Sequence, residues 1–567
     1  RSVGVSGGSG RPPVVTTRTT SKAHPCVSAG KSALSTPAPV NTAPAPSYTA
    51  PAPSHTAVPT RGQASAPTQP PLAAGKDPLL SDFEDTDDDG DAVVNSAVAN
   101  TDVPRTYAQA MRSPDRDEWA GAVRAEREVL ESMGTFELVP ESQPRQGGYN
   151  VLHSGWVFAK KPLLTGGVKF KGRVVARGNE QREGIDYHEV YAPVVNPVTM
   201  RVLLAIAAQR GYDVDQLDVT AAFLNGKLDA DEHVYMHIPD GFERVPGHVF
   251  KLRRSLYGLR QSPRHWNRVL HEFMMGHGMQ QSQVDRCLYY IPGVLYVVCW
   301  VDDILIMSAD GGAKAAFKAA IAGQFPVRDL GEARSFLGME LTVDKQRHTV
   351  TLTSSAKIAA MLDKYGVANT AVKYTPMPPK LVMLPAGFAG NNDVELTAQF
   401  PYRELVGALL YLAAWTRPDI AFAVSQLTRF SERPTHTHWR VAKHVLAYLK
   451  GTASLGLCYS RDQGVVISTH TVHAASPTAG VSPAPADVLR FQEMTAPTVL
   501  STAQPVGFVD ASWGEDVSSR RSQAAYVFVL AGAAVLWGTK LQQVVAQSST
   551  EAEYLSLAWA VKDALFV

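Results

Sequence analysis

Two stretches of sequence decide the fold: QLDVTAAFLNG at residues 216–226 and WVDDILI at residues 300–306. In the first stretch apolar and polar residues alternate, which predicts a strand with Asp218 on the face opposite its apolar neighbours. In the second stretch Asp302 and Asp303 stand between two apolar runs, LYVVCW and ILIM. This pattern predicts a β-hairpin with the two aspartates at its bend.

The aspartate pair has two explanations. Aspartate tolerates the backbone angles of tight turns, so ordinary turn chemistry accounts for the pair taken alone. With Asp218 on a second strand, however, the carboxylates would form an oxygen-rich site for hard divalent cations. Two such ions about 4 Å apart can activate a 3′-hydroxyl and stabilise a leaving pyrophosphate. Two basic stretches without acids, 155–164 and 251–268, would supply charge for a nucleic-acid backbone, although a solvated surface explains either stretch alone.

The composition excludes several classes of protein. With 45% hydrophobic residues among 567, the chain can bury large cores, and its length suggests three or four domains. Lys and Arg (54) balance Asp and Glu (53), so only local patches could recognise nucleic acid. The four cysteines lack disulfide-framework or zinc spacing, and the longest apolar run is too short to span a bilayer. No signal peptide is visible and the chain starts at Arg1, so we expect a segment of a longer protein.

Changes in composition along the chain predict where it folds. Residues 1–105 are rich in Pro, Ala, Ser and Thr, include the acidic run Ser81–Asp91, and predict a disordered linker. The segment Asn196–Gly211 predicts a helix, with an Asn cap, Pro in the first turn and Gly after the end. Residues 461–504 predict a low-complexity insertion. Four strand patterns (GFVDASW, AAYVFVL, AVLWG and QVVA) and a helix capped by Ser548 follow.

An ordered set of longer motifs resembles one known family. The motifs are GTFELVP (134–140), KGRVVARGNEQREGIDYHEVYAPV (171–194), VYMHIPDGF (234–242), LRRSLYGLRQSPRHW (252–266), DLGEARSFLGMEL (329–341) and YRELVGALLYLAAWTRPDIAFAVSQLTRF (402–430). Together with the two stretches above, they resemble the reverse transcriptase within the Pol polyprotein of copia-type retrotransposons. The resemblance covers about residues 106–567.

The resemblance implies an α+β fold built as a right-hand polymerase with fingers, palm and thumb. It implies fingers and palm in residues 106–345 and a helical thumb or connection region in 346–460. Residues 505–567 would form a truncated RNase H-like α/β domain, and the linker would precede all of these.

The resemblance also implies the catalytic groups. Asp218, Asp302 and Asp303 match the palm carboxylates, which would hold two Mg²⁺ ions, with Mn²⁺ as a possible substitute. Because successive strand residues point apart, Asp218 and Asp302 would make the main bridging contacts, with Asp303 closer to the primer end. The family usually has Tyr where this chain has Trp300, and both rings are large enough to pack under a primer.

Nucleotide-binding residues are implied in the same way. Lys171 and Arg173 match residues that grip the triphosphate, and Tyr257 and Gly258 match a contact to the incoming nucleotide and template. Phe223 matches a bulky ring that crowds a ribose 2′-hydroxyl and would select deoxynucleotides, with plain core packing as the alternative.

The terminal segment matches only part of an RNase H site. Asp510 and Glu553 match two metal ligands, whereas Glu551 is expected to cap the helix. The further aspartates of the family would lie beyond Val567, so we expect little or no ribonuclease activity from this chain.

The implied partners are an RNA template, a DNA primer, deoxynucleoside triphosphates and an RNA–DNA hybrid, without a membrane. An integrase is expected upstream in the polyprotein, and the family implies an intracellular location, in a cytoplasmic particle or the nucleus. A catalytically decayed, nucleic-acid-binding relic is the alternative function. His436, His438 and His444 lack a Cys or carboxylate partner, so we expect packing or surface roles for them rather than metal binding.

Overall fold

The computed structural model describes residues 103–162, 167–388, 393–462, 465–467, 498–500 and 504–565. Residues 1–102 of the predicted linker, including its acidic run, lie outside the described residues, as does most of the predicted low-complexity insertion. The described parts combine helices with mainly antiparallel sheets, so the fold is of the mixed α+β kind. Within these ranges no helix has the length and apolar character needed to cross a bilayer.

The central element is a six-stranded sheet that contains both decisive stretches. Its strand order is β12-β5-β11-β10-β9-β8, with bounds β12 Val327–Glu332, β5 Asp213–Val219, β11 Asp303–Ser308, β10 Leu295–Trp300, β9 Leu288–Ile291 and β8 Gln280–Gln281. The predicted strand and the predicted hairpin are therefore confirmed, and β5 pairs directly with β11.

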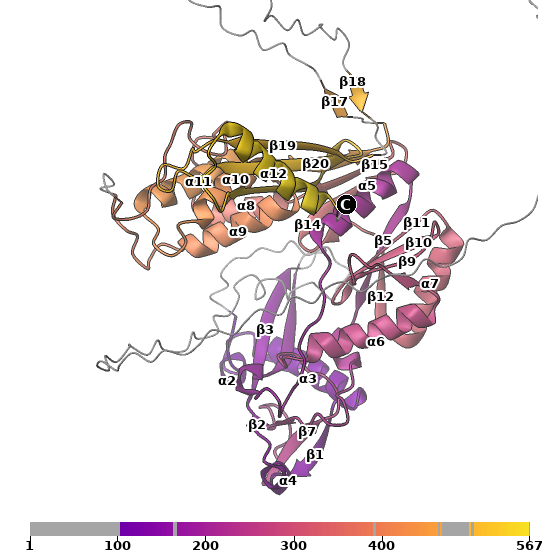
Figure 1. Ribbon diagram of the computed structural model, residues 1–567. Helices are drawn as coiled ribbons and strands as arrows, with labels where there is room; N and C mark the ends of the chain where they lie inside the picture. Colours follow the sequence, from indigo (N-terminus) through magenta and orange to yellow (C-terminus); the bar gives the residue numbers. More distant parts are fainter. Residues whose placement is uncertain are drawn as a thin grey trace, which may run out of the picture. The chain divides into compact units, whose positions relative to one another are not determined.

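The two faces of this sheet belong to different cores because strand residues alternate. Leu217 and Val219 pack with α6 (Ser262–Gly276) and α7 (Gly311–Gln324) in one core. Val214 on the other face packs with α5 (Pro197–Arg210) in a second core. Figure 1 shows α6 and α7 beside the sheet.

The helix α5 begins and ends as its sequence predicts. The side chain of Asn196 accepts a hydrogen bond from the N–H of Val198, and Pro197 occupies the first turn. Gly211 ends the helix with a φ of 68°, in the left-handed region that glycine tolerates.

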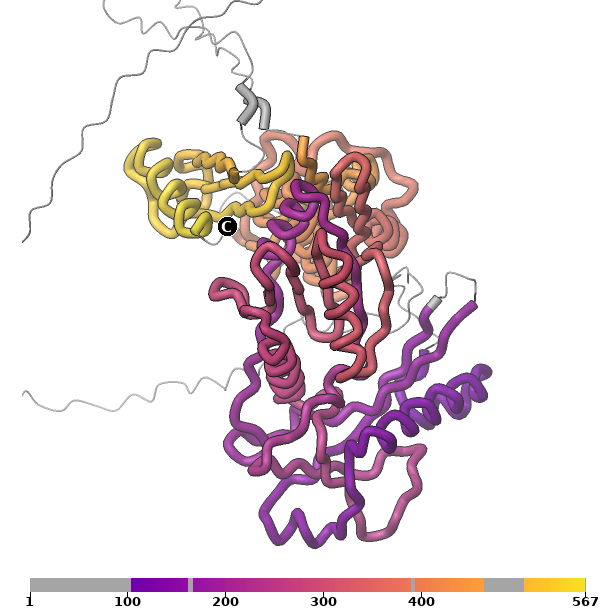
Figure 2. Tube along the Cα trace, turned by 90° about the vertical axis from the view of Figure 1, so that its right-hand side faces the viewer, coloured from indigo at the N-terminus to yellow at the C-terminus, as the bar shows by residue number. Residues whose placement is uncertain are grey.

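A separate core lies in the N-terminal part of the described chain. It contains the sheet β1-β7-β6-β2, the hairpin β3–β4 and the helix α3 (Arg116–Ser132), which packs against β4. The strand bounds are β1 Phe136–Pro140, β2 Val151–Leu152, β3 Ser154–Pro162, β4 Val168–Ala176, β6 Tyr235–Met236 and β7 His248–Leu252, and two short helices, α2 Tyr107–Ala110 and α4 Ser142–Gly147, complete this part. Figure 2 shows the β3–β4 hairpin running beside α3.

The region after the central sheet mixes a sheet with helices. The sheet β13-β14-β15-β16 has bounds Ser335–Phe336, Met339–Asp344, Thr349–Thr353 and Leu457–Ser460, and the helices are α8 Ser355–Lys364, α9 Tyr402–Trp415, α10 Ala421–Thr428 and α11 His436–Gly451. The expected boundary at 345/346 thus falls inside the β14–β15 hairpin. The expected helical region, 346–460, also contributes two strands to this sheet.

The C-terminal segment has three strands and one helix. Here β19 (Val506–Ser512), β20 (Gln523–Leu530) and β21 (Ala533–Leu541) form an antiparallel sheet, and α12 (Ser549–Ala564) packs on β19 and β20. The prediction of a fourth strand at QVVA, 543–546, was wrong. The chain leaves the sheet after Leu541 and bends toward the cap of α12, so Val544 and Val545 are exposed. The pair β17 (Val465–Ile467) and β18 (Thr498–Leu500) forms a separate two-stranded sheet.

One core joins this C-terminal segment to α5 and α9. Val535 and Leu536 of β21 belong to the same buried cluster as the residues of α5 and α9. At its centre, Arg201 of α5 is 3% exposed and donates 2.7 Å hydrogen bonds to the carbonyls of Val535 and Ala414. Its guanidinium lies 4.0 Å from the ring centroid of Trp537, and burial lowers the pKa of Arg201 to about 10. Arg201 thus fastens β21 to the end of α9.

Candidate active site

Two of the three predicted carboxylates lie side by side on neighbouring strands of the central sheet. Asp218 of β5 is paired directly with Asp303 of β11, and paired residues of antiparallel strands project from the same face. Asp218 is 1% exposed and Asp303 is 3% exposed, and the Nε2 of Gln216 donates a 3.0 Å hydrogen bond to Asp303. Asp302 lies next to this pair, in the turn, where it is half-buried.

The turn that carries Asp302 has an unusual backbone. Trp300 pairs with Asp303, so the hairpin turns on only two residues, Val301 and Asp302. Val301 has a φ of 52°, a left-handed conformation that disfavours β-branched side chains and typically costs about 1–3 kcal/mol. Two hydrogen bonds fix the turn carbonyls: Val219 N–H donates to Asp302 O at 2.9 Å, and Trp266 Nε1–H donates to Val301 O at 2.6 Å.

Three of the predicted nucleotide-binding side chains contact one another. The guanidinium of Arg173, on β4, lies 4.8 Å from the ring centroid of Tyr257, within cation–π range. The ring of Phe223 lies 5.4 Å from the same tyrosine ring, edge to face. Phe223 also packs partly against the core under α6, so its packing and its contact with Tyr257 coexist. Lys171 lies two residues before Arg173 on β4, on the same face of that strand.

Gly258 is required by a close backbone approach. Its φ is 87°, and a Cβ there would lie 2.2 Å from the carbonyl oxygen of Ala176. The neighbouring carbonyl of Tyr257 accepts a 2.9 Å hydrogen bond from Ala176 N–H. The Tyr257-Gly258 turn therefore docks against the end of β4, which brings Tyr257 to Arg173.

Trp300, at the end of β10, packs onto a helix of the next region. Its ring is partly buried and meets Trp415, at the end of α9, edge to face with centroids 6.0 Å apart. Trp300 therefore connects the hairpin to α9.

The predicted RNase H residues lie on elements that pack together. Asp510 on β19 and Glu553 on α12 are both exposed. Glu551 lies in the first turn of α12: its N–H donates a 3.1 Å hydrogen bond to the Ser548 hydroxyl, whereas its carboxylate accepts from Gln547 N–H at 2.6 Å rather than from Ser548 N–H, so only half of the expected capping box forms.

The three histidines have packing or surface contacts, as expected. The Nδ1 of buried His438 accepts a 2.9 Å hydrogen bond from Thr435 N–H at the start of α11, and its ring stacks on Phe430. Burial lowers the pKa of His438 to about 4. His444 bonds the carbonyl of Thr375, and the ring of exposed His436 meets Phe400.

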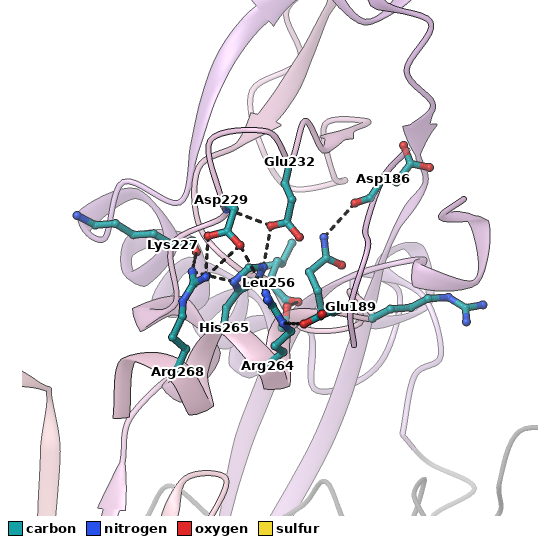
Figure 3. Close-up of polar contacts among 12 residues, drawn as sticks. Asp186, Glu189, Lys227, Asp229, Glu232, Leu256, Arg264, His265 and Arg268 are labelled. Atoms are coloured by element: carbon teal, nitrogen blue, oxygen red, sulfur yellow. Dashed lines mark hydrogen bonds and ion pairs between the residues drawn. The ribbon is translucent and has the colours of Figure 1, made fainter. Parts of the chain in front are cut away.

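A different cluster brings together possible metal ligands (Figure 3). Within the described ranges, Asp229, Glu232 and His265 are the one group of three such residues whose ligand atoms lie within 4.8 Å of one another. Arg268 bonds Asp229 at 2.7 Å, and its hydrogen bonds and charge hold the pKa of Asp229 below its ordinary value although burial opposes this. Arg264 adds a second positive charge near Asp229. The two arginines already neutralise Asp229, and Glu232 pairs with His265, so the cluster ties the 226–232 loop to α6 rather than offering a cation site.

Sequence reasoning missed three residues around the site. Gln216 and Trp266 stand inside recognised motifs, but their partners, Asp303 and Val301, are distant in sequence. Arg201 gave no signal, because a lone arginine on an apolar helix does not reveal a buried role.

The sequence of this chain is similar to those of known proteins. Residues 135–379 match the family described as reverse transcriptase (RNA-dependent DNA polymerase). The chain is 32% identical over 476 residues to the retrovirus-related Pol polyprotein from transposon TNT 1-94 of Nicotiana tabacum, covering 82% of this chain and 32% of that protein. It is 32% identical over 478 residues to the Pol polyprotein from transposon RE2 of Arabidopsis thaliana, covering 82% and 28%. The chain thus spans about a third of the length of these relatives.

Among solved structures, a foamy viral protease–reverse transcriptase in complex with double-stranded DNA is similar. It shares 11% identity and a TM-score of 0.35, over 79% of this chain and 60% of that one. So distant a likeness places no residue, and the sequence relatives identify the family instead.

The matched residues define the class: the part of the chain at 135–379 belongs to the reverse transcriptase family, a family of nucleotidyltransferases. Within that family it is homologous to the reverse transcriptase region of copia-type retrotransposon Pol polyproteins.

Proposed function

We propose that this chain is an RNA-directed and DNA-directed DNA polymerase that extends a primer 3′-hydroxyl with deoxynucleotides. The observation that carries the proposal is the pairing of buried Asp218 with buried Asp303, beside Asp302 in the turn. In the reaction the 3′-oxygen would bond to the α-phosphorus of the triphosphate while pyrophosphate leaves. The expected order of fingers and palm (106–345), thumb or connection (346–460) and RNase H-like segment (505–567) belongs to the same proposal.

The carboxylates fit a pair of divalent cations. Two buried carboxylates on neighbouring strands, with a third in the adjacent turn, bring several oxygen ligands to one place, and hard divalent cations prefer such ligands. Asp218, Asp302 and Asp303 would hold Mg²⁺, or Mn²⁺ in its place. When bound, the ions would lower the pKa of the primer hydroxyl and neutralise charge on the leaving group. Whether Asp302 or Asp303 makes the main bridging contact stays a prediction, although the register sets Asp303 opposite Asp218.

The aromatic and basic cluster at β4 would bind the nucleotide. Lys171 and Arg173 would attract the triphosphate, and the contact with Tyr257 orients the guanidinium of Arg173. Phe223, held against Tyr257, would crowd a ribose 2′-hydroxyl and so favour deoxynucleotides. Template and primer, as RNA–DNA hybrid or DNA duplex, would be bound through their phosphates by basic side chains.

We propose that the C-terminal segment is an RNase H-like domain with little or no ribonuclease activity. In the described residues 504–565 no three possible metal ligands cluster, and Asp510 and Glu553 are exposed. Two exposed carboxylates bind divalent ions weakly, because hard cations of this kind need several oxygen ligands.

Primer extension on RNA and DNA templates tests the polymerase. We expect the full chain to add deoxynucleotides with Mg²⁺ and Asp302→Asn to lose more than about a hundredfold in rate, since several kcal/mol of charge stabilisation depend on the ligand. Asp117→Asn, an exposed carboxylate on α3, is the matched control and should keep full activity. Undiminished activity of Asp302→Asn would refute the site. An inactive wild-type chain that still binds template–primer would instead identify a decayed relic.

A second measurement tests nucleotide selection. Phe223→Val should add ribonucleotides more readily while deoxynucleotide addition is largely kept, because the smaller side chain leaves room for the 2′-hydroxyl. Unaltered discrimination in this variant would leave Phe223 with a packing role only.

A further inference from the structure

The catalytic hairpin turns on a strained residue that needs external support. Val301 holds a φ of 52° at the first position of a two-residue turn. A conformation of this kind persists only where its surroundings over-determine it. The side chain of Asp302, the next residue, takes its direction from this backbone.

Besides the backbone hydrogen bond from Val219 N–H to Asp302 O, the turn is supported by one side chain of α6. Trp266 is 2% exposed, and its indole N–H donates a 2.6 Å hydrogen bond to the carbonyl oxygen of Val301. The ring packs edge to face on Phe325, with centroids 5.2 Å apart. Both rings belong to the core that contains Leu217 and Ile304, the apolar faces of β5 and β11. Core packing therefore holds the indole of Trp266 in place, and its N–H holds the carbonyl of Val301.

The segment of α6 that carries Trp266 is itself anchored from the other side. The neighbouring residue, His265, is fully buried, and its Nε2 lies 2.7 Å from Glu232. Arg268 bonds both Asp229 and the Nδ1 of His265, as Figure 3 shows. The ion-pair cluster thus holds this turn of the helix against the 226–232 loop. The cluster, Trp266 and the hairpin form one continuous series of contacts.

We propose that Trp266 is a positioning residue that sets the orientation of Asp302 by holding the Val301 carbonyl, and this rests on the polymerase function proposed above. Trp266 is buried, and its one polar group bonds the turn carbonyl of Val301. Its effect passes through the turn backbone, so its loss would lower the rate of the chemical step while leaving nucleotide binding, which depends on the β4 cluster, unchanged.

The substitution Trp266→Phe keeps an aromatic ring in the core and removes the N–H. Trp156→Phe is the matched control: Trp156 is also buried and donates its indole N–H to a backbone carbonyl, that of Asp240, at 2.8 Å in the other core. Phe325→Leu is a packing control that changes the environment of Trp266 but keeps its N–H.

Two readouts on the full chain decide the proposal. In hydrogen–deuterium exchange, the peptide spanning residues 295–308 should exchange faster in Trp266→Phe than in the wild type, with no change in Trp156→Phe. In primer extension, Trp266→Phe should lose about tenfold in kcat at unchanged nucleotide KM, the effect of one buried hydrogen bond. Phe325→Leu should show a smaller loss in kcat.

Several outcomes would overturn the proposal. The first is that Trp266→Phe exchanges and turns over like Trp156→Phe. The second is that the hairpin exchanges faster but kcat is unchanged. The third is that only the nucleotide KM rises while kcat is unchanged. If the wild-type chain adds no nucleotide, the polymerase function fails, and the exchange comparison alone then decides whether Trp266 holds the hairpin. If Trp266→Phe does not fold, benzothienylalanine at position 266, which keeps the bicyclic ring and lacks the N–H, replaces it in both measurements.

Discussion

The buried Arg201 provides a demanding test of how the C-terminal segment is attached. We consider Arg201→Met, which keeps an unbranched apolar stem and removes the guanidinium. The wild-type side chain makes two 2.7 Å hydrogen bonds to carbonyls and a cation–π contact with Trp537. Hydrogen bonds from a charged donor contribute about 1.5–3 kcal/mol each, and a desolvated cation–π contact about 2 kcal/mol.

The cost of burying the charge opposes these gains. Lowering the pKa of Arg201 from 12.5 to about 10 corresponds to roughly 3 kcal/mol against the charged form. The balance leaves a net contribution of about 3 kcal/mol to the free energy of unfolding. Arg201→Met should lose this amount, and Arg201→Lys should lose most of it, because a single ammonium cannot match the two-pronged geometry.

Urea unfolding followed by tryptophan fluorescence measures the loss, since Trp537 and Trp415 lie at the junction. Hydrogen exchange of the peptide 533–541 should show that β21 loosens first. Arg210→Met is the matched control, an exposed arginine at the end of the same helix, and should unfold like the wild type. A midpoint for Arg201→Met equal to that of Arg210→Met would refute the reasoning.

Three further predictions follow from features of the fold. Gly258→Ala should lower the free energy of unfolding by more than about 2 kcal/mol and abolish primer extension, because its Cβ would clash with Ala176 O. Gly121→Ala in α3, where the new Cβ meets nothing, is the control and should stabilise the chain slightly in the same thermal unfolding experiment. Equal effects of the two substitutions would contradict the argument. Burial lowers the pKa of His438 to about 4 in the folded chain, whereas the unfolded value is about 6.5. The contribution of His438 to the free energy of unfolding is therefore complete above pH 6.5, and about 3 kcal/mol of it is lost as the pH falls from 6.5 to 4. His438→Gln should flatten this part of the pH–stability curve, although the charge of Asp393 opposes the lowering of the histidine pKa. The exposed His436→Gln is the control and should leave the curve as it is. A curve unchanged by His438→Gln would contradict the explanation. Finally, the chain should not cleave the RNA strand of a labelled RNA–DNA hybrid with Mg²⁺ or Mn²⁺; cleavage lost in Asp510→Asn would show that the C-terminal site is complete enough to act.

Local patterns predicted the elements that local physics controls. The cap and stop of α5, the strand β5 and the β10–β11 hairpin all depend on residues close in sequence, so spacing and residue type were sufficient. The QVVA pattern failed for the converse reason: a β-favouring run becomes a strand only if a partner strand is available, and β21 leaves the sheet before it. Alternation placed Asp218 on the right face but could not give the register, which pairs it with Asp303 rather than Asp302.

Long-range contacts supplied what the sequence could not show. Arg201 and Val535 are 334 residues apart, and Trp266 and Val301 are 35 apart. Neither pair leaves a periodic or compositional trace, because each depends on how separate elements pack. The resemblance to a family gave the aspartates for which we predict a catalytic role, whereas the residues that hold the hairpin and the junction emerged only from the folded structure.

The core shared by α5, α9 and β21 has a consequence for how the chain could be processed. Contacts of Arg201 and Trp537, with the hydrogen bond from Ser460 N–H to Ala531 O, link the C-terminal segment directly to the part of the chain before Asp462. A peptide bond cut between residues 467 and 498 would therefore yield two polypeptides that remain together as subunits of a heterodimer.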